Sequence, residues 1–201
     1  MSVPRFLPLP EPLADPLLDL RELLRQVHAR MGRIEASIER VSFVIHDPGS
    51  DLLCTYLCHD RRQHGAVFEA RSLHALPGLA ALPRRREARV VDDLAADAAA
   101  LPAHVRWLLA RGWRSSLTLP LLRGEQLLGF LFVNASQPAV FTPARLEALQ
   151  PLLDLLLLRI GDHLASLADL RAPPWRWWRR WWPCVIPSPV FIRRGWAATA
   201  S

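Results

Sequence analysis

The sequence predicts an α+β domain, an antiparallel sheet flanked by helices, and three observations indicate this class. The chain has 201 residues and is 51% hydrophobic, so it is long and apolar enough to bury the core of one domain. Its strand-like segments come in hairpins rather than in regular alternation with helices, which favours an antiparallel sheet. Amphipathic helical segments stand at both ends of this strand region.

The first helix is predicted from Leu17 to about Ser37. Its apolar residues recur every three or four positions while Arg and Glu fill the other face, which is typical of a helix lying on a core. The preceding residues 1–16 contain five prolines and predict an irregular, mostly extended leader.

The strand region begins with a predicted hairpin. Val41–Ile45 and Leu52–Leu57 have strand-forming compositions, and the turn-forming residues His46–Ser50 separate them. A third strand is predicted at Ala66–Ala70, and a brief extended segment at Arg89–Val91.

A mixed region and short helices follow. Residues 72–89 contain two prolines and a glycine that are expected to break regular structure. Ala95–Ala110 predicts one or two short helices that Pro102 interrupts. Gly112 is expected to end the last of them, because glycine tolerates a left-handed conformation.

The second half of the chain predicts two strands and a long helix. The strands are Ser115–Leu122 and Leu127–Val133, and the second is apolar throughout, so we expect it at the centre of the sheet. Thr142 is a suitable cap and Pro143 a suitable first residue for a helix that runs to about residue 168.

The charge of the chain is unevenly placed. All 25 basic residues are arginine, and residues 171–201 hold six of them and no acid. The net charge of +6 therefore belongs to this tail, while residues 1–170 carry equal numbers of Arg and of Asp plus Glu. We expect no binding to nucleic acid, because a folded nucleic-acid-binding domain shows a basic face.

We interpret residues 169–201 as a separate Trp/Arg/Pro-rich tail that is disordered or out of frame. Six of the eight tryptophans lie there, and the composition changes abruptly. GC-rich DNA encodes such residues when it is read out of register, which favours a frame-shift product. The alternative is a native tail whose indole rings and guanidinium groups contact the membrane surface.

Three cysteines and the lack of a secretory signal predict a reducing, cytoplasmic setting. The most apolar stretch, Leu146–Leu158, is too short and too polar to span a membrane. Cys54 and Cys58 would share a face on a helix or on a strand, and we expect them to be buried free thiols.

Residues 112–142 carry a recognisable set of motifs. They contain GWRSSLTLPL, a glycine turn, LGFLFVN and then Phe-Thr at the entry to the last helix. This set resembles the C-terminal half of a GAF domain. Residues 40–58 and Arg89–Leu94 resemble its earlier strands, so that the resemblance covers roughly residues 20–165. The form is similar to GAF domains that precede HD-type or HD-GYP-type phosphohydrolase modules in bacterial signalling proteins.

The resemblance implies a function without catalysis. GAF domains sense small molecules and dimerise, so we expect a sensory module of a bacterial signalling protein that forms a homodimer through helices 17–38 and 143–168. The ligand is not specified, and the sequence requires no cofactor and no metal. One alternative is the truncated remnant of an HD-GYP-type cyclic-dinucleotide phosphodiesterase that lacks its catalytic half. Another is association with a membrane surface through the tail.

The candidate ligand-binding residues come from one strand, the helix end before it and an arginine run. In a GAF-like fold the strand from residue 115 lines the cavity, where hydroxyl groups could donate to a ligand or satisfy local backbone. The arginine run at 84–86 could be a solvated loop or could pair with an anionic ligand. The candidates are Ser115, Ser116, Thr118, Trp113, Arg84 and Arg86.

Two His-Asp pairs, His46-Asp47 and His59-Asp60, match the motif by which HD phosphohydrolases hold metals. Their expected positions, in a hairpin turn and at a strand end, argue for a loop role. The remaining aromatic residues of this half, Trp107, Phe130 and Phe132, are expected in the core.

Overall fold

The structure is a computed structural model that describes residues 16–62, 71–96 and 103–169. The chain divides into two compact units, Met1–His163 and Leu164–Ser201, and the sheet belongs to the first. The predicted strand Ala66–Ala70, the leader up to residue 15 and the tail from residue 170 lie outside the described residues. The proposed domain boundaries therefore stay predictions.

The elements follow the predicted order, with additions between the third and fourth strands. The helices are α1 (Pro16–Ile34), the 3-10 helix η1 (Leu73–Ala75), α2 (Pro77–Ala80), α3 (Leu82–Arg85), α4 (Ala103–Ala110) and α5 (Pro143–Asp169). The strands are β1 (Ile38–Asp47), β2 (Leu52–Asp60), β3 (Arg71–Ser72), β4 (Arg89–Val91), β5 (Ser115–Arg123) and β6 (Gln126–Ala135).

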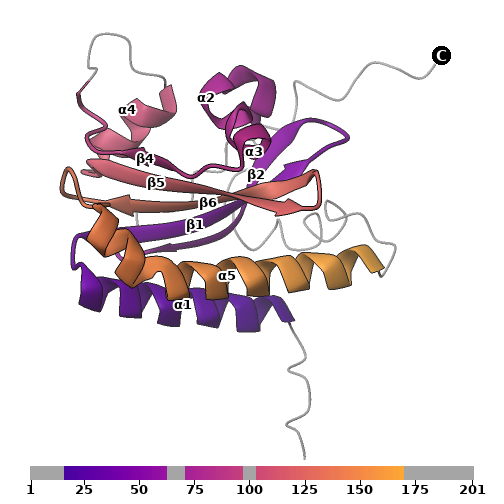
Figure 1. Ribbon diagram of the computed structural model, residues 1–201, viewed down its shortest axis with the longest axis horizontal. Coiled ribbons are helices and arrows are strands. Elements are labelled where there is room, and N and C mark those ends of the chain that lie inside the picture. Colours follow the sequence, from indigo (N-terminus) through magenta and orange to yellow (C-terminus); the bar gives the residue numbers. More distant parts are fainter. Residues whose placement is uncertain (1–15, 63–70, 97–102, 170–201) are drawn as a thin grey trace, which may run out of the picture. The chain divides into compact units, whose positions relative to one another are not determined.

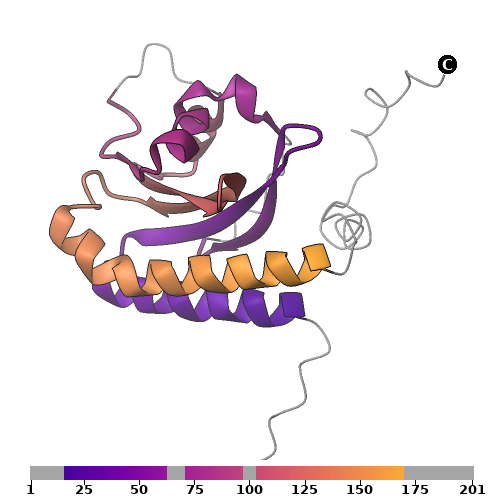
Figure 2. The ribbon, with the colours of Figure 1, turned by 45° about the vertical axis from the view of Figure 1, so that its right-hand side comes forward.

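The strands form one six-stranded sheet in the order β3-β2-β1-β6-β5-β4, and each pair is antiparallel. The predicted α+β class is confirmed, and the apolar strand β6 lies at the centre. Helices α1 and α5 lie side by side on one face of the sheet, while η1, α2, α3 and α4 lie on the other (Figures 1 and 2). We call these the helix-pair face and the short-helix face.

The main core lies between the helix pair and the sheet. Because side chains alternate along a strand, every second residue of β1, β2, β5 and β6 points toward α1 and α5. The buried residues of this layer are Leu20, Leu24, Val27 and Met31 of α1, Leu149, Leu153, Leu156 and Ile160 of α5, and Val41, Phe43, Leu57, Leu117, Leu131 and Val133 of the sheet.

One buried polar pair lies within this core. His28 of α1 is fully buried, and its Nε2 lies 3.1 Å from the carbonyl oxygen of Ile38. Since a carbonyl only accepts, Nε2 carries the proton and Nδ1 accepts from Nδ1 of His59, 2.6 Å away. Burial lowers the pKa of His28 to about 4, so that the ring is neutral in the folded protein near neutral pH.

The ends of two helices confirm the sequence predictions. Gly112 has a φ of +82° just after α4, in the left-handed region. Thr142 caps α5, since its Oγ1 accepts from the backbone N–H of Arg145 at 3.4 Å. Another glycine, Gly129 in β6, permits a close approach of β6 to β1, because a Cβ at this position would overlap the carbonyl oxygen of Val44.

The mixed pattern of residues 72–89 folds into η1, α2 and α3. Its prolines start helices instead of preventing them: Pro77 is the first residue of α2, and Pro83 lies in the first turn of α3. Proline is tolerated there because first-turn N–H groups have no partner within the helix. Pro16, which we assigned to the leader, likewise begins α1.

A β-bulge in β2 corrects the prediction for the two cysteines. Leu57 pairs with Phe43, but the next paired residue is Thr55, so Tyr56 is an extra residue. Cys54 consequently lies opposite Ile45 and Cys58 opposite Ser42, three residues apart on β1 and therefore on opposite faces. Both are free thiols, as predicted, but they are partly buried rather than fully buried, and this burial raises the pKa of each.

Candidate functional site

Buried polar side chains lie across the short-helix face of the sheet. They come from alternate positions of three neighbouring strands, and the pairing places Arg40 and Ser116 opposite Asn134 on either side of β6. Ser42 is fully buried, and Ser116, Thr118 and Asn134 are nearly so. A sheet face that is only packed against apolar helices has no need of such groups.

Asn134 joins the neighbouring strands through its amide. The Nδ2 group donates to Ser116 Oγ at 3.0 Å, and Arg40 Nη1 donates to Asn134 Oδ1 at 2.8 Å. The guanidinium carbon of Arg40 lies 5.6 Å from the ring centroid of Trp107 and 5.4 Å from that of Trp113. The two indole rings are themselves 5.5 Å apart, so the cation is held by two aromatic rings and one amide.

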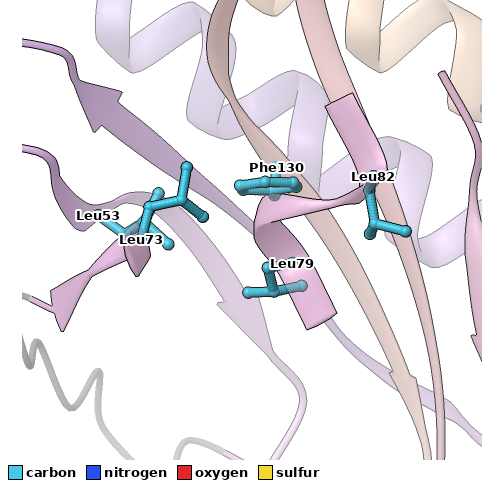
Figure 3. Packing of buried hydrophobic residues seen from close by; sticks show 5 residues of the cluster. All are labelled: Leu53, Leu73, Leu79, Leu82 and Phe130. Carbon is cyan, nitrogen blue, oxygen red and sulfur yellow. The ribbon is translucent and has the colours of Figure 1, made fainter. Parts of the chain in front are cut away.

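An apolar cluster covers the other part of this face. Phe130 of β6 and Leu53 of β2 pack with Leu73, Leu79 and Leu82 from η1, α2 and α3 (Figure 3). Phe132 packs against the edge of this cluster and pairs with Ser42 and Thr118 in the sheet. The short-helix face is therefore polar near α4 and apolar under α2 and α3.

Asp51 attaches η1 to the β1–β2 turn. Its carboxylate accepts from Ser72 Oγ at 2.7 Å, from the backbone N–H of His74 at 3.1 Å, from His74 Nδ1 at 2.7 Å and from His46 Nε2 at 3.2 Å. These bonds, led by that from Ser72, hold the pKa of Asp51 well below its usual range. One side chain thus fixes the start of the segment that covers the apolar cluster.

The structure separates the candidate residues of the sequence analysis into two groups. Ser116, Thr118 and Trp113 lie together on the short-helix face. Ser115 is on the opposite side of β5, and its hydroxyl donates to the carbonyl of Gln137 at 2.8 Å, which is the local backbone role considered above. Asn134, named in the sequence only as part of a strand motif, is at the centre of the first group.

The two arginine candidates are exposed. Arg84 lies in the last turn of α3. Arg86 is the first residue after this helix and has a φ of 54°, in the left-handed region. Arg86 Nη2 donates to Glu125 Oε1 at 2.6 Å, in the turn between β5 and β6. That turn is at the other end of β5 from Ser116. Their role in ligand binding stays a prediction.

Sequence reasoning missed Arg40 and Ser42. Both stand in β1 at alternate positions among apolar residues, which is a signal for a polar sheet face. The predicted strand Val41–Ile45 does not include Arg40. Its partner Asn134 is 94 residues away in the sequence, and local patterns do not show such a pairing.

The His-Asp pairs have structural partners. His46 bonds to Asp51, and His59 bonds to His28. In the described ranges 16–62, 71–96 and 103–169, no group of three or more His, Cys, Asp or Glu is arranged to hold a metal ion. Within the same part of the chain, no helix has the length and apolar character needed to cross a membrane.

The family model of the GAF domain matches residues 18–158. The chain belongs to the GAF family. GAF domains are small-molecule-sensing modules of signalling proteins, and the resemblance in residues 112–142 is thereby confirmed. The comparison with curated proteins gave no match.

Solved structures agree on the fold. A GAF domain/HD domain protein from Geobacter sulfurreducens is 15% identical, with a TM-score of 0.53, covering 73% of this chain and 94% of that one. The PixJ GAF domain from Thermosynechococcus elongatus, in its blue-light absorbing form, is 18% identical with a TM-score of 0.54, covering 80% and 97%. The GAF domain of a two-component sensor histidine kinase from Bacillus halodurans is 14% identical with a TM-score of 0.55, covering 72% and 95%.

Proposed function

We propose that this GAF domain is a non-catalytic sensor that binds a small molecule on its short-helix face and acts as a homodimer through its helix pair. The observation that carries the proposal is the buried network of Arg40, Asn134 and Ser116 beside two tryptophans. A binding site needs a few placed polar groups next to apolar surface, and this face offers both.

The network lies close to the joined ends of the two long helices. Ser37, just before β1, accepts from the backbone N–H of Ser136, just after β6, at 2.9 Å. Beside them Arg145 of α5 forms an ion pair with Glu35 at 2.8 Å. Because Arg40 and Asn134 stand within three residues of this junction, a ligand that displaces them would shift α1 relative to α5.

The outer surface of the helix pair supports the dimer. Ile34 of α1 and Leu158 of α5 are 40% and 63% exposed, and they are two of the three large hydrophobic residues that are exposed among those described. A second copy of the chain would cover them in a four-helix arrangement.

The similarity to a GAF domain/HD domain protein supports a role next to an HD-type module, and the free thiols of Cys54 and Cys58 suit a cytoplasmic setting. The two alternatives, a phosphodiesterase remnant and membrane association, depend on the tail from residue 170. Since the tail lies outside the described residues, both stay predictions.

The ligand site is tested by thermal unfolding of the full chain in the presence of a metabolite library. We expect at least one metabolite to raise the melting temperature of the wild type. Asn134→Leu, which removes both hydrogen bonds, should abolish that rise, while the exposed-turn control Ser50→Ala should keep it. The same rise in Asn134→Leu would show that the metabolite binds elsewhere.

The dimer is tested by light scattering after gel filtration. The wild type is expected to have twice the mass of one chain, and Leu158→Glu to have the mass of one, because the charge cannot be buried between two copies. The control Ala144→Glu adds the same charge at an exposed position near the start of α5. A monomeric wild type at high concentration would contradict the dimer but leave the ligand site standing.

A further inference from the structure

We propose that the short-helix face binds the carboxylate group of a small organic acid through Arg40, at the position where this arginine meets Trp107 and Trp113. The inference rests on the proposed sensory function and names the chemistry of its ligand. Three observations carry it: a guanidinium group outside the described ion pairs, buried polar atoms without described partners around it, and nearby acids that already accept hydrogen bonds from other residues.

Arg40 is a half-buried cation whose contacts are all neutral. Among the described residues no ion pair includes it. Of its five N–H bonds, one is directed to Asn134 Oδ1 at 2.8 Å. Cys58 also lies near Arg40. Burial raises the pKa of the Cys58 thiol, and the positive charge of Arg40 partly opposes that rise. Sulfur is a weak acceptor, so this contact does not replace an anion. A partly desolvated guanidinium in such surroundings is complementary to an anion.

Four buried polar atoms near Arg40 have no hydrogen-bond partner within the described part of the chain. They are Ser42 Oγ, His104 Nδ1, Trp107 Nε1 and Arg111 Nε. Trp Nε1 and Arg Nε can only donate, so what they lack is an acceptor. Buried donors are almost always paired in native proteins. A ligand with acceptor oxygens would therefore supply the hydrogen-bond acceptors that Trp107 Nε1 and Arg111 Nε lack.

These atoms belong to one neighbourhood. Ser42 is two residues from Arg40 and on the same face of β1. His104 precedes Trp107 by one turn of α4. Arg111 is also close to that indole, with its guanidinium carbon 4.1 Å from the ring centroid. Trp107 thus contacts two cations and links the sheet to the end of α4.

The local charges also favour an anion. Arg71 and Arg89 add to the burial that lowers the pKa of His104, so positive charge surrounds the imidazole. The nearest acids have other partners. Asp93 accepts from Arg114 Nε at 3.0 Å and Nη2 at 2.7 Å, and Glu39 of β1 pairs with Arg62. Asp60 of β2 lies opposite Arg40 in the sheet and accepts from the backbone N–H of Arg62 at 2.9 Å, and none of the described ion pairs joins it to Arg40.

The geometry of Arg40 suits a carboxylate. Its guanidinium supplies a planar pair of donors, which match the two coplanar oxygens of that group. Next to Arg40 and Ser42, the aromatic ring of Phe132 leads to the apolar cluster around Phe130. We therefore expect a ligand whose charged group binds at Arg40 and whose apolar body lies along Phe132.

The test is the melting temperature of the full chain in sodium acetate and sodium benzoate, compared with sodium chloride at the same ionic strength. Benzamide serves as the neutral analogue and sodium phosphate as the other anion. We expect benzoate at ten times its dissociation constant to raise the melting temperature by about 3 °C. Acetate should have a smaller effect, and benzamide and phosphate none. Arg40→Gln should abolish the rise, while Arg30→Gln, an exposed arginine of α1, should keep it.

Each other outcome overturns the carboxylate assignment. Equal shifts in Arg40→Gln and in the wild type would place the anion elsewhere, and a larger effect of phosphate would make phosphate the ligand class. No shift by either carboxylate, with a library metabolite still acting through Asn134, would refute the assignment and leave the sensory function intact. If neither a carboxylate nor any library metabolite raises the melting temperature, the carboxylate assignment and the proposed ligand site both fail.

A second variant keeps the proposal testable if Arg40→Gln does not fold. Trp107→Phe keeps an aromatic ring and removes one donor, so we expect it to fold and to bind benzoate several-fold more weakly. The indole N–H signal of Trp107 in the NMR spectrum of the wild type should shift on addition of benzoate. An unchanged signal at saturation, with unchanged affinity in Trp107→Phe, would contradict the assignment.

Discussion

The two faces of the sheet differ in the helices that cover them and in whether their buried polar groups have hydrogen-bond partners. On the helix-pair face, two long helices supply a continuous apolar layer, and the one buried histidine pair is hydrogen-bonded to itself and to the backbone. On the short-helix face, buried polar atoms such as Ser42 Oγ and Trp107 Nε1 have no described partner. Both faces are built from the same strands, so the difference comes from what packs on each face, and it is the basis of the proposal that the short-helix face binds a ligand.

The largest expected effect comes from removing apolar volume on each face. Leu156→Ala on α5 is expected to lower the free energy of unfolding by about 3 kcal/mol, because it leaves a cavity between two fixed layers. Leu79→Ala on the four-residue helix α2 should cost less than half of that, since the short segment can move into the space. Urea denaturation of both variants measures the difference, and equal costs would contradict the comparison of the two faces.

The second effect is the pH dependence that His28 gives to the helix-pair face. Its pKa is lowered from 6.5 to about 4, so the unfolded chain takes up a proton first as the pH falls. The free energy of unfolding is therefore unaffected by this group above pH 6.5 and decreases between pH 6.5 and 4, by at most about 3 kcal/mol. His28→Gln should remove most of this slope in urea denaturation at several pH values. A slope as steep as that of the wild type would assign the effect to other groups.

The smallest effect distinguishes the two serines of the short-helix face. Ser116→Ala removes the acceptor of Asn134 Nδ2 and should cost about 1 kcal/mol. Ser42→Ala removes a buried hydroxyl that has no described partner, so the ligand-free protein should be as stable as the wild type or slightly more stable. Thermal unfolding of the two variants gives the comparison, and a loss in Ser42→Ala as large as in Ser116→Ala would reveal a partner of that hydroxyl.

The sequence predicts the regular parts of the molecule because their periodicity is local. The apolar spacing in α1 and α5, the paired strands and the cap at Thr142 all follow from neighbouring residues. The helices η1, α2 and α3 were not predicted, because Pro77 and Pro83 were treated as breakers although each lies in a first turn.

The candidate site was predicted only in part, for two physical reasons. Alternation along β5 separates Ser115 from Ser116 and Thr118, and a list of hydroxyl residues does not show which face each one occupies. The central pair, Arg40 and Asn134, depends on the register between β1 and β6, which distant parts of the chain determine together.

The β-bulge at Tyr56 has a consequence for the deletion of a residue in β2. The extra residue lets Tyr56 bond to His163 of α5 on the helix-pair face, while Leu53 reaches the apolar cluster on the other. Deleting Tyr56 would remove the bulge and leave the pairs Leu57–Phe43 and Thr55–Val44 as they are, so that Leu53 and Cys54 would keep their faces while the bond to His163 is lost. A single codon thus adds a contact between β2 and α5 without changing the register or the order of the sheet.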